Sequence, residues 1–443
     1  MSRTENRPPG GRRRRPKEPL DPFQQRIRDI GRAIAGKPLS EALTEDSPLK
    51  ELIAEIVQAA FDEEMREHLG YEPHERQKAS EDAPETRRKN TRNGHSRKRL
   101  KTSHGETEIE VPRDRQGSFE PHIVPKYGSI TREVEDRVIS MYAMGMTTRD
   151  IRDHVRELYG LKASEMFVSR IVERLEPILA EWRGRPLEAI YPVVFIDALH
   201  TKQRHASGVA STAVYVVNGY GEAGGMDVLG LYMAQEGETT GESASFWHQV
   251  LIELEKRGVK DIMIVCADQL SGLEEAVASV FSQARFQPCI VHAMRSSLRR
   301  VPWSERKIVA REIKKIYQAP TYDRAEAALE HVRELYGRRY PAVVRQWAAL
   351  LPRLSDLWNY STPLRKLVYT INPMENVNRQ IRKVTKNRGV LPNRESALRL
   401  LTLVLMRIDQ KNKKRVRPDW TRIVQELAIH FPDRLPENWG LRI

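Results

Sequence analysis

Cysteine is scarce in this chain, with only Cys266 and Cys289 among 443 residues. Both lie inside apolar runs, so a disulfide framework is excluded and we expect a reducing compartment. No run approaches the roughly 18 consecutive apolar residues that a membrane-spanning helix needs. The N-terminal segment also lacks the apolar stretch of a secretory signal. These absences predict a cytoplasmic protein that has no membrane partner.

Acidic residues are outnumbered in the chain. Lys and Arg together number 74 and Asp and Glu 60, which gives a formal net charge of +14. Such a balance favours a polyanionic partner, with nucleic acid as the first candidate and an anionic membrane surface as the second. The length is sufficient for two or three domains with at least one large hydrophobic core.

The N-terminal part of the sequence is predicted to bind DNA. Residues 1–20 are rich in Arg, Pro and Gly and indicate a disordered basic arm. Residues 21–125 form a mainly helical and basic region, in which a long basic run is followed by a strand-like segment, Thr107–Val111. A solvated loop is the alternative interpretation of that run. The candidate DNA contacts in it are Arg87, Arg88, Lys89, Arg92, Arg97, Lys98, Arg99 and Lys101.

A helix-turn-helix-like region is expected at residues 126–185. Two amphipathic stretches there flank a short connection, with Gly160 as a stop signal and Ser164 as an N-cap. The second helix, Glu165–Leu175, would present basic and polar side chains to a major groove. Two capped helices around a turn also occur in proteins that never meet DNA. The candidate contacts are Ser169, Arg170 and Arg174.

The central sequence predicts an α/β core. Three strand-like runs are followed by a helix, a strand, a helix and a last strand, which favours a mixed five-stranded sheet of the ribonuclease-H-like kind. This core is assigned to residues 186–293 and 369–410, with a helical insertion at 294–368 and a tail at 411–443. The expected strands are Tyr191–Ala198, Ala213–Asn218, Val228–Met233, Asp261–Ala267 and Phe286–Val291.

Three tryptophans mark the predicted insertion. For Trp303, Trp347 and Trp358 we expect packing in the core rather than stacking on a flipped base. After the insertion, a long helix-compatible segment runs from Pro373 through Ile408.

Three carboxylates are candidates for one catalytic site. Asp197 and Asp268 each end an apolar strand, where two bare carboxylates would repel unless a hard cation neutralised them. Glu375, at the start of a later helix, supplies a third ligand of the kind that two-metal phosphoryl transfer uses. The alternative is structural: aspartates after strands often begin turns or cap helices. Asn372, Pro373 and Glu375 likewise make a variant of the capping box.

Many segments resemble the bacterial mutator-type insertion-sequence transposases of the DDE superfamily. They run in order along nearly the whole chain, and the resemblance implies that Asp197, Asp268 and Glu375 are the catalytic and metal-binding triad. It implies strand cleavage and strand transfer at terminal inverted repeats, with two Mg²⁺ ions or Mn²⁺ in their place and no small-molecule cofactor. The segments include LGYEPHER, RNGHSRKRLKT, YAMGMTTRDIRDHV, FIDALH, CADQLSGLEEAVASVF, CIVHAMRSSLRRVPW, YTINPMENVNRQIRKV and LLTLVLMRI.

The resemblance also implies partners and further residues. They are terminal-repeat and target DNA, a homodimer or higher oligomer on DNA, and a nucleoid-associated bacterial location. Cys289 and His292 form a family Cys-x-x-His pair, which is too small for a closed zinc site. We expect Cys289 to pack at the end of its strand and His292 to lie near the active site or the DNA backbone. Arg379 is a candidate phosphate contact, with an ion pair to Glu375 as its alternative.

The sequence departs from the family pattern at two places, which leaves other functions open. Gln269 stands where the family has a small residue, and INPMEN replaces the usual residues around the catalytic Glu. Neither change removes a predicted metal ligand. The two alternatives are a domesticated DNA-binding protein without catalysis and a structure-specific nuclease of the same fold.

Overall fold

The computed structural model describes residues 22–36, 48–72, 90–102, 105–124, 131–159, 161, 163–233, 243–369, 372–436 and 439. The predicted basic arm lies outside the described residues. The chain divides into two compact units, one of Met1–Val138 with Arg152–Ser164, the other of Ile139–Ile151 with Glu165–Ile443. No helix in the described part is long and apolar enough to cross a membrane.

The first unit packs a β-hairpin on a helix. Its strands pair antiparallel, and apolar side chains of the second strand and of Leu100 meet Phe61 on the long helix. Thr107–Val111 is a strand, as expected, but much of the basic run before it is a strand too, so the loop interpretation is wrong there. The elements are α1 (Pro22–Ile34), α3 (Pro48–Leu69), β1 (Arg92–Thr102) and β2 (Gly105–Asp114).

One buried carboxylate fixes the end of the hairpin. Asp114 accepts hydrogen bonds from the side chain of Asn90 at 2.7 Å and from the backbone N–H groups of Ser118 and Phe119. Burial alone would raise the pKa of Asp114, but these donors hold it well below its usual range. The carboxylate therefore ties the residues before β1 to the turn after β2.

Three helices follow the hairpin in the sequence. They are α4 (Arg132–Ala143), α5 (Thr148–Tyr159) and α6 (Glu165–Glu173), followed by α7 (Glu176–Gly184). The expected helix at Glu165–Leu175 is thus present, and it ends two residues early. Val168, Ile171 and Val172 are its buried face.

A five-stranded mixed sheet forms the centre of the second unit. Its order is β5-β4-β3-β6-β7, with the first three strands antiparallel and β6 and β7 parallel to β3. All five expected strands are present in the expected order along the chain, although the bounds of several differ. The strands are β3 (Ile190–His205), β4 (Gly208–Tyr220), β5 (Met226–Met233), β6 (Asp261–Ala267) and β7 (Arg285–Pro288).

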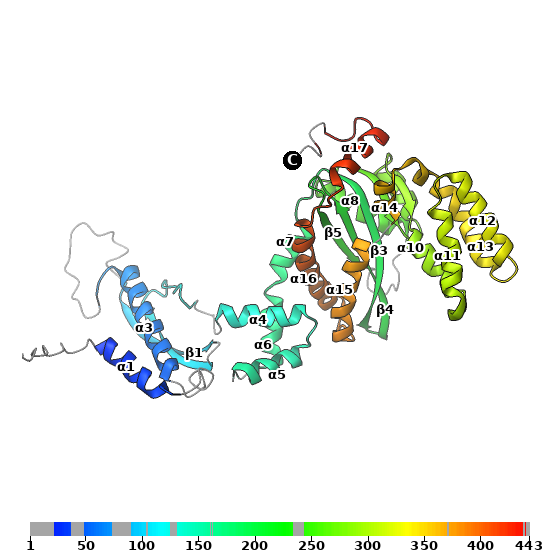
Figure 1. The fold of residues 1–443 in the computed structure, drawn as a ribbon. Helices are drawn as coiled ribbons and strands as arrows, with labels where there is room; N and C mark the ends of the chain where they lie inside the picture. Colours follow the sequence, from blue (N-terminus) through cyan, green and yellow to red (C-terminus); the bar gives the residue numbers. More distant parts are fainter. Residues whose placement is uncertain are drawn as a thin grey trace, which may run out of the picture. The chain divides into compact units, whose positions relative to one another are not determined.

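Helices cover both faces of this sheet. α8 (Ala244–Lys256) and α9 (Leu273–Val280) pack on one face around Trp247 and Leu251. α15 (Asn372–Arg388) and α16 (Arg394–Lys413) lie on the other face, against β3 and β5 (Figure 1). The helix-compatible segment from Pro373 to Ile408 is helical, as expected, but forms two helices, because the chain turns at Gly389 with a φ of +73°.

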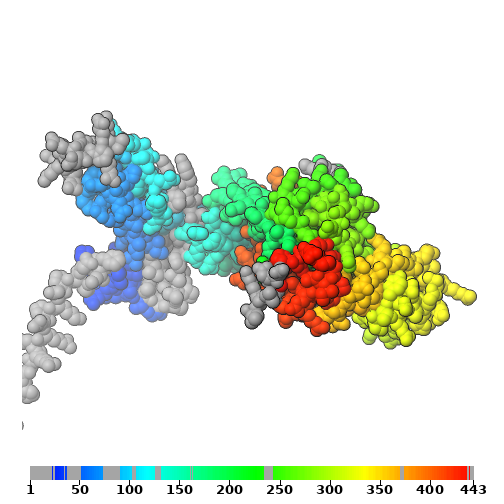
Figure 2. Space-filling view, turned by 90° about the horizontal axis from the view of Figure 1, so that it is seen from above, coloured from blue at the N-terminus to red at the C-terminus, as the bar shows by residue number. Residues whose placement is uncertain are grey.

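The insertion is helical, as the sequence predicts, and forms a lobe beside the sheet (Figure 2). Trp347 is fully buried, and its indole N–H donates to Ser297. Trp358 donates to the carbonyl of Ala319, whereas Trp303 is 85% exposed, so core packing is wrong for it. The elements are α10 (Ile290–Arg299), η2 (Trp303–Glu305), α11 (Arg306–Tyr317), α12 (Tyr322–Tyr336), α13 (Pro341–Leu350), η3 (Leu351–Asn359) and α14 (Thr362–Tyr369); α17 (Trp420–His430) lies in the C-terminal segment.

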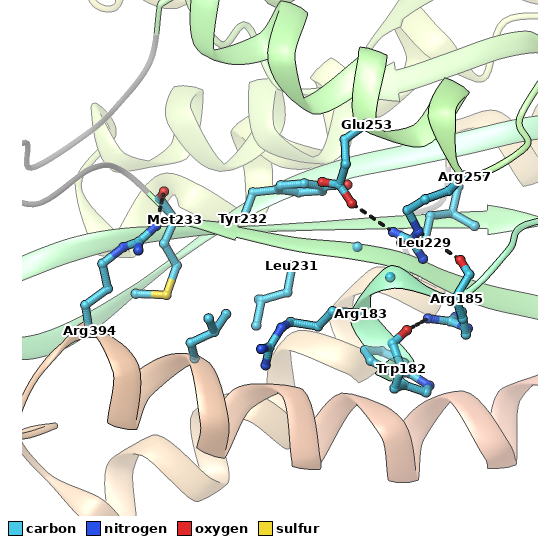
Figure 3. A pocket seen from close by; sticks show the side chains of 13 residues that line it. Trp182, Arg183, Arg185, Leu229, Leu231, Tyr232, Met233, Glu253, Arg257 and Arg394 are labelled. Carbon is cyan, nitrogen blue, oxygen red and sulfur yellow. Dashed lines mark hydrogen bonds and ion pairs between the residues drawn. The ribbon is translucent and has the colours of Figure 1, made fainter. Parts of the chain in front are cut away.

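Arginines cap the outer edge of β5. Arg185, Arg257 and Arg394 donate to carbonyls of Val228, Leu229 and Met233 at 2.6, 2.7 and 3.4 Å. These side chains line a pocket of about 290 Å³ (Figure 3). An edge strand with free carbonyls invites pairing with another chain. The arginines occupy those carbonyls and close the sheet on this side.

Candidate active site

Two of the predicted carboxylates meet where β3 and β6 run side by side. The parallel pairing of these strands ends at Ile196 and Ala267, so the next residues, Asp197 and Asp268, are neighbours. The Asp197 side chain is 6% exposed and that of Asp268 is 43% exposed. The buried carboxylate of Asp197 and the more exposed carboxylate of Asp268 therefore belong to one acidic site.

Asp197 does not end its strand, contrary to the sequence prediction. β3 continues to His205 and stays paired with β4 beyond the end of β6. Past Asp197 the strand alternates between buried and exposed residues, which is the pattern of a hairpin arm with one solvated face. The apolar run therefore marks the part of β3 that is covered on both sides, and not the whole strand.

His292 contacts both aspartates from the first turn of α10. Its Nε2 lies 3.5 Å from an Asp197 oxygen, and its Nδ1 lies 3.8 Å from an Asp268 oxygen. His292 therefore lies beside two of the predicted carboxylates, and its role in an active site stays a prediction. The orientation of α10 is set locally, because Cys289 Sγ accepts a hydrogen bond from the His292 backbone N–H at 3.1 Å.

Cys289 is buried directly after the end of β7, as expected, and it also caps the helix that follows. The strand expected to reach Val291 ends at Pro288, and α10 begins at Ile290. Proline has no N–H for a further ladder hydrogen bond, which suits a strand end. Burial raises the pKa of the Cys289 thiol to about 12, so the side chain stays a neutral thiol at physiological pH.

Helix α15, which carries the third predicted carboxylate, contacts Asp197. Asn378 is buried, and its amide donates a hydrogen bond to Asp197. Glu375 lies three residues earlier, and residues with this spacing are neighbours on one helix face. Its carboxylate pairs with Arg295, which is three residues after His292 on α10. Asn378 therefore places this part of α15 against Asp197, while Glu375 is held by Arg295 of α10.

The donor set of this site suits a hard cation. Oδ1 of Asp197 is buried without a hydrogen-bond partner, and burial raises the pKa of this carboxyl although His292 and Asn378 act to lower it. An unpartnered buried carboxylate oxygen is costly unless a cation meets it. Within the described residues, no three His, Cys, Asp or Glu side chains are already grouped for metal binding. Glu375 would have to exchange Arg295 for the cation.

The chain matches known transposases over most of its length. A profile of the Mutator family of transposases matches residues 28–414. The chain belongs to this family. It is 34% identical over 406 residues to the transposase for insertion sequence element ISRM3 of Rhizobium meliloti (strain 1021), which covers 91% of this chain and 98% of that protein.

Two further relatives come from other bacterial groups. A probable insertion-sequence transposase of Corynebacterium diphtheriae is 36% identical over 347 residues, covering 74% of this chain and 99% of the relative. The transposase for insertion sequence element IS256 in transposon Tn4001 of Staphylococcus aureus is 27% identical over 369 residues, covering 83% and 91%. The alignments span both units of the transposase.

The predicted DNA contacts in the hairpin have carboxylate neighbours. Arg97 faces Glu110, and the same register sets Arg99 opposite Glu108 and Lys101 opposite Glu106. Arg97 and Glu110 pair at 3.3 Å. These cross-strand pairs partly neutralise the outer face of β1, which the sequence reasoning missed although glutamates alternate in GETEIEVP.

Other residues of the basic run differ in environment. Lys98 is half-buried on the side of Leu100, and burial lowers its pKa. Arg92 donates from Nη2 to the Tyr71 carbonyl at 3.4 Å and lies over that ring. Arg87, Arg88 and Lys89 lie outside the described residues. Successive side chains of a strand point to opposite faces, so the residues of the basic run lie on both faces of β1.

The remaining predicted contacts lie on helices. On α6, Arg170 is exposed and Ser169 is half-buried, while the exposed Arg174 follows the helix end. Arg379 is exposed on α15 and donates to Asn376 at 3.0 Å, so it does not make the alternative pair with Glu375. Their contact with DNA stays a prediction.

Two functional candidates were missing from the sequence prediction. Arg295 and Asn378 contact the proposed triad, and neither was singled out. Helical spacing was the available signal. Arg295 lies three residues after His292, and Asn378 lies three residues after Glu375. That spacing identifies which side chains share a face, but not which of them turn toward another helix.

Proposed function

We propose that this chain is a DDE transposase that binds the terminal inverted repeats of an insertion sequence and catalyses metal-dependent strand cleavage and strand transfer. The convergence of β3, β6, α10 and α15 on Asp197 and Asp268 carries the proposal. The sheet order β5-β4-β3-β6-β7 supports a ribonuclease-H-like core. In this order β5 lies at one edge, and β6 and β7 lie on the other side of β3.

In this proposal Asp197, Asp268 and Glu375 hold two Mg²⁺ ions, and Mn²⁺ can replace them. When bound, the ions would activate the attacking oxygen and stabilise the leaving oxygen of phosphoryl transfer. Asn378 fixes the Asp197 carboxylate through one oxygen and leaves the other for a ligand. His292 would orient the two aspartates and add positive charge when it is protonated.

DNA is the proposed partner throughout. The printed names of the relatives describe transposases for insertion sequence elements, and transposition acts on DNA. The net charge of +14 suits a polyanion. Because two element ends must be joined in one reaction, we propose that the transposase works as a homodimer or higher oligomer on DNA.

The test is the Asp197→Asn variant with DNA ends in a cleavage and strand-transfer assay. We expect strand cleavage to fall by at least about 10³-fold while DNA binding stays within about twofold, because the change removes a metal-binding charge and keeps the side-chain volume. Asp323→Asn, an exposed carboxylate on α12, is the matched control. Undiminished cleavage by Asp197→Asn would refute the catalytic assignment.

A second assay separates joining from cutting. Pre-cleaved ends bypass hydrolysis and report strand transfer alone. A transposase joins such ends to target DNA, whereas a nuclease of the same fold leaves them unjoined, and a domesticated binding protein does neither reaction.

A further inference from the structure

A cleft of about 450 Å³ lies between α15 and α16, beside the turn that follows α4. It is on the helix that carries Glu375 but away from the aspartates, and nothing in the catalytic proposal uses it. Its α15 wall consists of Gln380, Lys383 and Asn387, which share one helix face, and its α16 wall includes Arg407 and Lys411.

The charge of the cleft has one sign. No acidic residue is among those that line it. Lys383 and Lys411 are exposed, and in the part of the chain that the structure describes they form no ion pair. Arg407 donates only to the hydroxyl of Ser140, at 3.1 Å. Three cations with no carboxylate beside them distinguish this cleft from the charge-paired hairpin face.

The surrounding helix extends the positive surface. Glu375 is the only acidic residue of α15, and after it the helix carries five cationic residues. Arg379, Arg382 and Lys386 recur on the Glu375 face and are exposed. Basic residues therefore recur along α15 between Glu375 and the cleft-lining Lys383.

The floor of the cleft is apolar. Met144, which is 58% exposed, lies there with Val384 and Ile408. Cations suit phosphates, carboxamides can hydrogen-bond phosphates or base edges, and an apolar floor can accept the carbon atoms of a sugar. A small inorganic anion would use only the cations. The combination fits the sugar-phosphate backbone of a nucleic acid strand.

We propose that this cleft binds one DNA strand close to the reaction site, with phosphates on Lys383, Arg407 and Lys411. The distance to the reacting phosphate rests on the proposed function. Lys383 is eight residues beyond Glu375, which is about 12 Å along the helix at ~1.5 Å per residue. At ~3.4 Å of rise per phosphate, the contacted phosphate lies about three or four nucleotides from the reacting one.

The first experiment measures DNA affinity against salt concentration in EDTA, where no catalysis occurs. The variant combines Lys383→Ala, Arg407→Ala and Lys411→Ala. Each lost phosphate contact reduces the slope of log affinity against log salt by about 0.9, so we expect a reduction of about 2 to 3 and at least a ~tenfold loss of affinity at low salt. Lys307→Ala, Lys314→Ala and Arg324→Ala, exposed on α11 and α12, form the control that removes equal charge.

The second experiment localises the strand. Both native cysteines are buried, so Asn387→Cys supplies a single exposed thiol for a photo-crosslinker, with Lys314→Cys as its control. We expect crosslinks to DNA from residue 387 and none from 314. Crosslinks confined to element-end duplexes would identify donor DNA, and equal crosslinks to an unrelated duplex would identify target DNA.

The outcomes separate this inference from the proposed function. If the triple variant keeps the wild-type salt slope and affinity while the protein still cleaves DNA, the cleft is not a DNA site and the catalytic proposal stands. If Asp197→Asn cleaves normally but the triple variant loses its salt slope, the catalytic assignment fails and the cleft remains. Methylphosphonate substitution should weaken binding most at the third or fourth phosphate from the cleavage point. A uniform effect along the DNA would overturn the predicted position.

Discussion

Asn378 donates a hydrogen bond to Asp197 across 181 residues of sequence, and both side chains are buried. The bond joins helix α15 to strand β3 at the proposed catalytic site. It fixes one oxygen of the carboxylate, and the other oxygen, which has no hydrogen bond, lies 3.5 Å from Nε2 of His292. The position of Glu375 depends on it, since the same helix carries both residues.

Replacing Asn378 should therefore weaken catalysis more than folding. In Asn378→Ala the Asp197 carboxylate loses its donor and becomes free to rotate, and changes behind metal ligands commonly cost about 10- to 100-fold in activity. We expect a loss of that size in strand cleavage with unchanged DNA affinity. Asn376→Ala, on the same helix, is the control. Equal losses in both variants would point to a general defect of α15.

Arg295 is expected to restrain Glu375 before a metal binds. In Arg295→Ala the carboxylate loses its cationic partner, so the site gains negative charge and should bind Mn²⁺ more tightly, by about threefold or more. Titration calorimetry without DNA measures this directly. Arg299→Ala, one turn farther along α10, should leave Mn²⁺ affinity unchanged. Weaker binding by Arg295→Ala would show that the arginine supports the metal site.

A buried acidic pair should make folding stability depend on pH. Burial and the neighbouring Asp227 raise the pKa of Asp409 to about 6. An unfolded Asp titrates near 3.9. Between about pH 4 and 6 the folded protein therefore holds a proton that the unfolded chain has lost, and this group's contribution to stability falls as the pH rises through that window.

The Asp409→Asn variant isolates this effect. The amide can still accept the hydrogen bond from the Val228 N–H. Relative to wild type, its free energy of unfolding should rise by on the order of 2 kcal/mol between pH 4.5 and pH 7. Urea denaturation at both values provides the measurement, with Asp323→Asn as the exposed control. A difference that does not change with pH would contradict the raised pKa.

Gly145 should tolerate no side chain. Its φ is +90°, and a Cβ there would lie 2.4 Å from the carbonyl oxygen of Val384 on α15. Gly145→Ala therefore combines an unfavourable backbone conformation with a backbone collision, and we expect a loss of about 2 kcal/mol or more in thermal denaturation. Gly389→Ala is the matched control, with a φ of +73° and open space around it. Its loss should stay near 1 kcal/mol, and equal losses would show that the collision is relieved.

The sheet was predictable from the sequence because its strands have local patterns of apolar residues. After Asp261 the run DIMIVCA is apolar and buried, and the element order favours β6 as a strand parallel to β3. The basic strand β1 was missed because its alternation consists of Arg and Lys with a single buried Leu100. Long cationic side chains hide the alternation of buried and exposed residues that marks a strand. Their aliphatic stems can be covered while their charged ends stay in water.

By itself the sequence determined the succession of strands and helices, because local periodicity carries that information, and the order of its motifs singled out Asp197, Asp268 and Glu375 as candidates. Only the tertiary structure decided which side chains meet them. Asn378 contacts Asp197 and Arg295 contacts Glu375 because α10 and α15 both contact Asp197 on β3, through His292 and Asn378. How two helices pack depends on contacts between residues far apart in the sequence. A local sequence pattern therefore does not reveal which charged side chain of one helix will meet another helix.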